Sequence, residues 1–126
     1  MLHDAQGERG SAVVDFVLVS VLVVALFAVV FQVGLALHAR TVLVSVAAEG
    51  ARYGANADVS DPGAVEARTR AAVATAFTPG YAARARISPE LGDVVRVRIS
   101  APLPLAFLPG APVRLTVDAH ALEEAR

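Results

Sequence analysis

The hydrophobic residues of this chain are concentrated in one run near its N-terminus. The run lies within Ser11–Leu37, and Ser20 is the only polar residue between Phe16 and Phe31. As an α-helix, residues 16–37 would span roughly 33 Å at a rise of about 1.5 Å per residue. The hydrocarbon core of a bilayer is about 30 Å thick, and a helix that is apolar on every face has no side suited to water. We therefore predict one membrane-spanning helix over residues 11–37.

Polar residues return after Leu37, but no helix breaker accompanies them. Steps of three and four persist over Thr41–Ala57, which predicts that the helix continues as the spine of a domain. Gly50 and Gly54 have the G-x-x-x-G spacing of closely packed helices. Two alternatives follow: these small residues make room for the chain's own strands, or they pack against a helix of another subunit.

A second, shorter helix is predicted over Pro62–Phe77. Asp61 is a good N-cap residue, and proline suits the first helical position that follows it. Glu66 and Arg70 have the favourable i,i+4 order for an ion pair. The sequence Thr78-Pro79-Gly80 is expected to end this helix.

The remainder of the chain alternates between apolar and polar residues with a period of two. The alternation predicts three half-buried strands, over Ala83–Ile87, Val95–Ile99 and Val113–Ala119. Turn residues at Pro89–Asp93 and Pro102–Pro112 separate them, which favours an antiparallel meander with one face on the helices. The predicted fold class is α+β: a long N-terminal transmembrane helix continuing as a spine, a second short helix and a small antiparallel sheet of about three strands.

The water-facing side of that sheet is expected to carry five arginines: Arg84, Arg86, Arg96, Arg98 and Arg114. Either this side is simply solvated, or it meets an anionic partner such as an acidic cell-wall polymer, a surface glycan or a neighbouring subunit. The Pro102–Pro112 segment holds Leu103, Leu105, Phe107 and Leu108. It is expected either to fold over the domain's own core or to present an apolar contact to a partner.

Composition and the absence of reactive clusters argue against several functions. The net charge of −1 disfavours nucleic acid as a general partner, and the lack of cysteine excludes disulfides and thiolate metal sites. The histidines His3, His38 and His120 have no metal-ligand companion at i+4, and no catalytic motif is present. We expect no enzymatic activity, no cofactor, no metal and no small-molecule substrate.

The start of the apolar run carries a recognisable pattern. Gly10 is followed by four residues, then Asp15 and Phe16, and this resembles the processing site of the type IV pilin superfamily. The stretch GERGSAVVDF, with QVGLALHARTVLVSVAAEGARYGA after it, is similar to the TadE-like family, pilin-like proteins of the tight-adherence (Flp) pilus systems. The chain departs from the family pattern in two ways: the acid is aspartate rather than the usual glutamate, and the leader carries a single arginine, Arg9, where a more basic leader is common.

The resemblance implies a processing step and a mechanism of assembly. A prepilin peptidase would cut between Gly10 and Ser11 and remove the leader, residues 1–10. Asp15, with Phe16 as its aromatic neighbour, would be the helix-assembly acid that pairs with the Ser11 amine of an adjacent subunit. From the residues alone, the favoured interpretation of Asp15 is a carboxylate that reaches back to the lipid headgroups.

The resemblance also implies a role and a location. The protein would be a single-pass component of the cytoplasmic membrane, with a cytoplasmic N-terminus and an extracytoplasmic pilin-like domain over residues 38–126. It would act as a pseudopilin that supports Flp pilus assembly and adhesion together with other pilin-like subunits. The alternative is an uncleaved, membrane-anchored binding module that recruits a partner in the cell envelope.

Overall fold

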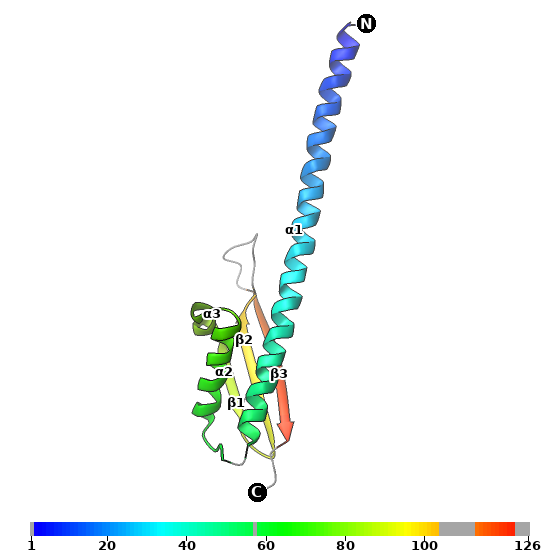
Figure 1. Cartoon of the computed structure of the whole chain (residues 1–126). Coiled ribbons are helices and arrows are strands. Elements are labelled where there is room, and N and C mark those ends of the chain that lie inside the picture. The colour runs from blue at the N-terminus through cyan, green and yellow to red at the C-terminus, as the bar shows by residue number, and fades with distance from the viewer. Residues whose placement is uncertain (1, 57, 104–112, 123–126) are drawn as a thin grey trace. The chain divides into compact units, whose positions relative to one another are not determined.

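The computed structural model describes residues 2–56, 58–103 and 113–122. Their secondary structure consists of three helices followed by three strands (Figure 1). The elements are α1 (Leu2–Ala55), α2 (Pro62–Ala76), α3 (Pro79–Arg84), β1 (Arg86–Glu90), β2 (Val94–Pro102) and β3 (Arg114–Leu122). The predicted α+β class, with a long apolar N-terminal helix and a three-stranded antiparallel sheet, is confirmed.

The chain divides into two compact units, Met1–Gly34 and Leu35–Arg126. In the first unit the described backbone is helical throughout, because it is the N-terminal part of α1. The helix begins at Leu2, so it also includes residues 2–10 of the predicted leader.

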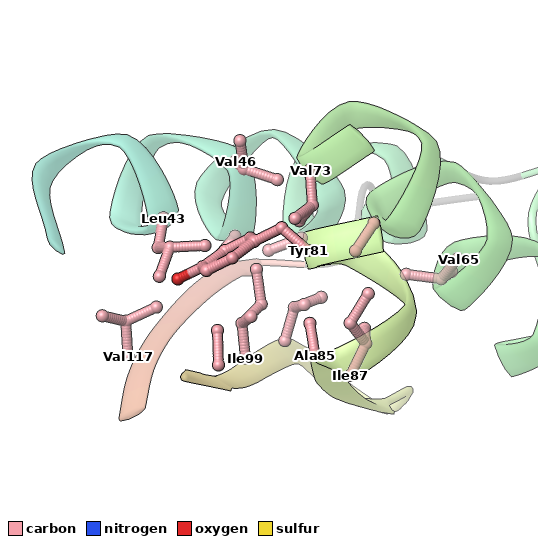
Figure 2. Close-up of a cluster of buried hydrophobic side chains, with 14 residues drawn as sticks. Leu43, Val46, Val65, Val73, Tyr81, Ala85, Ile87, Ile99 and Val117 are labelled. Carbon is pink, nitrogen blue, oxygen red and sulfur yellow. The ribbon is translucent and has the colours of Figure 1, made fainter. Parts of the chain in front are cut away.

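The second unit combines residues 35–55 of α1 with α2, α3 and the sheet. The buried residues of α1 recur at steps of three and four, including Leu43, Val46 and Ala47. They meet Val65 and Val73 of α2 and the inward side chains of the sheet in one hydrophobic core. Figure 2 shows this cluster, in which the ring of Tyr81 lies among side chains from the helices and the strands.

Helix α2 begins as its sequence predicts. The Asp61 carboxylate accepts a hydrogen bond from the Gly63 N–H at 2.9 Å, and Pro62 occupies the first helical position. The predicted Glu66–Arg70 ion pair is present, with 3.1 Å between Oε1 and Nη2. The helix ends at Ala76, one residue earlier than predicted.

The sheet is the predicted antiparallel meander, with strand order β1-β2-β3. Its register pairs Ile87 with Ile99 across β1 and β2, and Ile99 with Val117 across β2 and β3. The central strand alternates strictly over most of its length: Val95, Val97 and Ile99 are buried, while the intervening Arg96 and Arg98 are exposed. One face of the sheet therefore covers the core and the other faces solvent.

Three further predictions at the element boundaries are wrong. Ala83 and Arg84 belong to α3 rather than to a strand, because the Thr78 side chain accepts a hydrogen bond from the Tyr81 N–H and starts a new helix instead of only ending α2. Pro89 lies in β1, not in a turn, and it is tolerated because β1 is an edge strand.

The third correction concerns Pro102, which is the last residue of β2 and pairs with Arg114. β1 pairs with β2 only as far as Ser100, so β2 has a single strand neighbour at Pro102 and a missing N–H is tolerated on the unpaired side. Residues 104–112 of the predicted apolar loop lie outside the described residues.

Candidate functional site

The residues predicted to form the processing and assembly site all lie on α1. Gly10, Ser11, Asp15 and Phe16 are exposed, and Phe16 retains 72% of its accessible surface. A Cβ atom added at Gly10 would meet nothing within 4 Å. These residues are therefore not buried by packing against other parts of the described chain.

The surface that follows the site is apolar on all sides. Most large hydrophobic residues from Val13 to Leu37 are exposed, among them Leu22, Val24 and Phe27, each with about two-thirds of its surface accessible. Among the described residues, one helix is long and apolar enough to cross a bilayer, and its most apolar window has a mean hydropathy of 3.0 with none of it buried. Such a surface is suited to lipid or to other apolar helices.

The polar and aromatic groups of this helix are accommodated locally. The Ser20 Oγ–H donates to the Phe16 carbonyl oxygen at 2.7 Å, one turn earlier. A serine bonded to its own helix backbone does not have to find a partner in lipid. The Phe27 and Phe31 rings stack at a centroid distance of 6.2 Å on the same face of the helix.

Gly50 and Gly54 pack against the chain's own elements. A Cβ at Gly50 would lie 2.4 Å from Thr69 Oγ1 of α2. A Cβ at Gly54 would lie 2.9 Å from a methyl group of Val95 and 3.2 Å from one of Val65. Of the two alternatives for this glycine pair, the structure favours room for the chain's own helix and sheet.

The structure also shows interactions that the sequence pattern did not indicate. Arg70 donates to the carbonyl oxygens of Ala82 and Ala85, which fastens α2 to the end of α3. Tyr81 donates from its hydroxyl to the Pro102 carbonyl oxygen at 2.8 Å, which fastens α3 to the end of β2. These donors bond to carbonyls 12 to 21 residues away, a separation that no local periodicity reveals.

The environment of Tyr81 changes its acidity. Burial raises the pKa of the Tyr81 hydroxyl above its usual value of 10.0, while the charges of Arg84 and Arg114 act in the lowering direction with smaller effects. Tyr81 also packs against Phe77, with 4.6 Å between the ring centroids. We assign this tyrosine to the packing of the domain.

No group of three or more histidines, cysteines, aspartates or glutamates in the described part of the chain is placed to hold a metal ion. The chemical feature that distinguishes the N-terminal site is a single carboxylate, Asp15, at the start of an exposed apolar helix. A lone carboxylate in such a position can neutralise a cation, and its interaction is strong where water is excluded.

Comparison with known proteins bears on this part of the chain. Residues 10–52 match the family model described as TadE-like protein. The match begins at Gly10 and includes Asp15, the apolar run and Gly50, and it confirms the resemblance predicted from the sequence. No curated protein and no solved structure matches the chain.

Proposed function

We propose that this protein is a membrane-anchored, pilin-like structural component of a tight-adherence (Flp) pilus system. It acts without enzymatic activity and supports assembly of the pilus and adhesion. Its helix crosses the cytoplasmic membrane with the N-terminus in the cytoplasm, and residues 38–126 lie outside. The observation that supports this proposal is the TadE-like match, because it includes both the predicted processing site and the exposed apolar helix.

The proposal gives Asp15 a specific task. Cleavage after Gly10 would make Ser11 the new N-terminus, with a charged α-amino group about one helical turn from Asp15. In an assembly where apolar helices lie side by side, Asp15 pairs with the Ser11 amine of an adjacent subunit. Two such charges about 4 Å apart attract with about 4 kcal/mol at an intermediate dielectric, compared with about 1 kcal/mol in water.

The geometry of α1 bears on how cleavage occurs. The Gly10–Ser11 bond lies inside the helix, so a peptidase must unwind the backbone around it. Gly10 lowers the cost of unwinding, since glycine is about 1 kcal/mol less favourable than alanine in a helix. The absence of neighbours around the Gly10 Cβ position means that no side-chain packing opposes the opening there.

Intact-mass measurement of the membrane-extracted protein tests the processing step. Co-expression with a prepilin peptidase is expected to remove the mass of Met1–Gly10. Gly10→Val should abolish this loss, because the peptidase must accommodate that residue. Gly7→Val is the matched control, since a Cβ at Gly7 also meets nothing within 4 Å.

The outcomes separate the proposal from its alternative. A protein that keeps Met1–Gly10 in the presence of active peptidase would favour the uncleaved binding module that recruits an envelope partner. Equal loss of processing in the Gly7 and Gly10 variants would indicate a general change in the leader and would count against cleavage at Gly10.

A further inference from the structure

The second unit has two distinct ends. Gly54, near the end of α1, lies against Val95, near the start of β2, and Figure 1 shows that α1 and β2 run in opposite directions along this unit. From Val95 to Pro102 the strand advances about 23 Å. A helix of the same length contains about 15 residues. Counted back from Gly54, this length places Ala39 of α1 level with Pro102. We call this the proximal end: residues 35–40 of α1, the end of β2 and the start of β3. Figure 1 shows that β2 ends and β3 begins there.

Three arginines gather at the proximal end, and we call Arg84, Arg86 and Arg114 the arginine cluster. Arg114 donates from Nη2 to the carbonyl oxygens of Ser100 and Arg84 at 2.8 and 2.9 Å, and from Nε to the Ser100 Oγ at 3.2 Å. Arg86 is the cross-strand partner of Ser100. All three arginines are exposed, and the backbone contacts hold the Arg114 guanidinium in place.

No carboxylate neutralises this cluster within the part of the chain that the structure describes. Among the described residues, Glu66–Arg70 is the one ion pair with a nitrogen and a carboxylate oxygen within 4.0 Å. On the solvent face of the sheet, Asp118 lies opposite Arg98 and Glu90 opposite Arg96, each away from the cluster in the register. The described acids that remain in this unit lie on α1 at Glu49, around the start of α2 at Asp58 and Asp61, and in the β1–β2 turn at Asp93.

The cluster lies at the end of the unit where the apolar run stops. Leu37 is the last exposed apolar residue of the run, and Arg40 follows within one turn. By the lengths given above, Ala39 is level with Pro102, which pairs with Arg114. If residues 11–37 are in lipid, the proximal end lies at the depth of the headgroups. Arginine is suited to that depth because its planar guanidinium binds phosphate oxygens in a bidentate manner.

We propose that the arginine cluster, together with Arg40, docks the second unit onto an anionic bilayer surface through the phosphate groups of its lipids. The inference rests on the proposed membrane anchoring and does not depend on which side of the membrane the unit faces. As the partner of the cluster, a bilayer is favoured over the Asp58, Asp61 and Asp93 carboxylates of a second copy. The membrane anchor holds the cluster beside the bilayer whether or not a second copy is present.

Depth measurements with a spin label test this docking on the full-length protein in lipid nanodiscs. The chain has no cysteine, so one label can be introduced at Gly80→Cys and, at the opposite end, at Gly92→Cys. A Cβ at either glycine meets nothing within 4 Å. A lipid with a Ni²⁺-chelating headgroup, kept at constant density, relaxes labels that lie close to the bilayer surface.

Relaxation of the residue-80 label is expected to rise when phosphatidylglycerol replaces part of the phosphatidylcholine, and to fall again in high salt. Each arginine near an anionic surface contributes roughly fivefold to the ratio of docked to undocked protein. Arg84→Gln with Arg86→Gln should therefore lower this ratio more than tenfold. Arg52→Gln with Arg96→Gln removes the same charge elsewhere on the unit and should leave it unchanged.

Equal relaxation in neutral and anionic nanodiscs would overturn the inference, and so would equal loss in both double variants. Relaxation that depends on the number of protein copies per nanodisc, rather than on lipid charge, would assign the cluster to a second subunit instead. Flotation with liposomes, which is measured separately, tests the anchoring itself. If the protein floats with the liposomes but the relaxation of its residue-80 label does not depend on lipid charge, the docking is contradicted and the anchoring is not.

Discussion

Asp15 is the one acidic side chain within residues 11–37, and it is exposed on α1. A carboxylate at the edge of an apolar helix is costly unless it is paired or close to the headgroups. Its position five residues after Gly10 is readable from the sequence, because it depends only on spacing. In the proposed assembly the partner of the carboxylate belongs to another subunit, so the spacing within one chain does not identify it.

Asp15→Asn should lower co-purification with pilin-like partners at least about tenfold, because loss of an ion pair in a low-dielectric setting costs well over 1.4 kcal/mol. Membrane insertion should be unaffected, since asparagine is similar in size and uncharged. Asp15→Glu keeps the carboxylate and should retain most of the interaction. Co-purification of the asparagine variant at wild-type levels would exclude the pairing.

Tyr81 provides a second test at the residue scale, through the stability of the domain. Tyr81→Phe should lower the free energy of unfolding by about 1 kcal/mol at neutral pH, because it removes the hydrogen bond to the Pro102 carbonyl oxygen. Chemical denaturation in detergent measures this difference. A variant as stable as the wild type would show that the bond contributes nothing net.

The pKa shift of Tyr81 predicts how the difference changes with pH. Because burial raises its folded-state pKa above 10.0, the unfolded chain loses this proton first. The contribution of Tyr81 is therefore complete below pH 10 and decreases as the pH rises through the folded-state pKa. The chain has no lysine or cysteine that would titrate in this range. The Tyr81→Phe protein should lose less stability there, and a parallel loss would contradict the assignment.

At the scale of elements, helix α2 and the meander were predicted because their signals are local. Asp61 and Pro62 mark a helix start by their chemistry, and alternation over Val95–Ile99 marks a strand by its period. Helix α3 was missed because Ala83 and Arg84 also fit a strand alternation. The Thr78 cap and the contacts of Tyr81 and Arg70 decide in favour of a helix.

The contact between α1 and α2 leads to a prediction about Gly50. Gly50→Ala places a methyl group against the buried Thr69 hydroxyl, and overpacking typically costs about 1–3 kcal/mol. After the gain of about 1 kcal/mol from replacing a helical glycine, we expect a net loss of up to about 2 kcal/mol. Gly80→Ala is the control, since a Cβ there meets nothing within 4 Å.

A double-mutant cycle identifies the cause of that loss. Thr69→Ala removes the atom that lies nearest to the new methyl group, so Gly50→Ala should cost less in that background. Thermal or chemical denaturation of the four proteins gives the coupling. Equal cost of Gly50→Ala with threonine or alanine at position 69 would mean that the contact with α2 does not limit this position.

At the scale of the whole molecule, hydrogen exchange in nanodiscs should follow the environment rather than the secondary structure. Amides over residues 15–37 are expected to exchange very slowly, because lipid excludes water from a helix that is otherwise unburied. Residues 2–10 are also helical, yet they should exchange quickly because they lie outside the apolar run. Protection of residues 2–10 as strong as that of the run would contradict the predicted start of the span.

The apolar helix, the TadE-like pattern from Gly10 to Phe16 and the alternation of the strands could all be predicted from the residues alone. These features depend on residue type at fixed spacing, so they are visible without a fold. Packing in three dimensions places Gly50 and Gly54 against the chain's own α2 and β2. It also bonds Arg114 to Ser100 and to the Arg84 carbonyl oxygen, and it sets Arg86 opposite Ser100 in the sheet. These contacts join residues at least 11 positions apart, and only the packing of the elements determines which distant residues become neighbours.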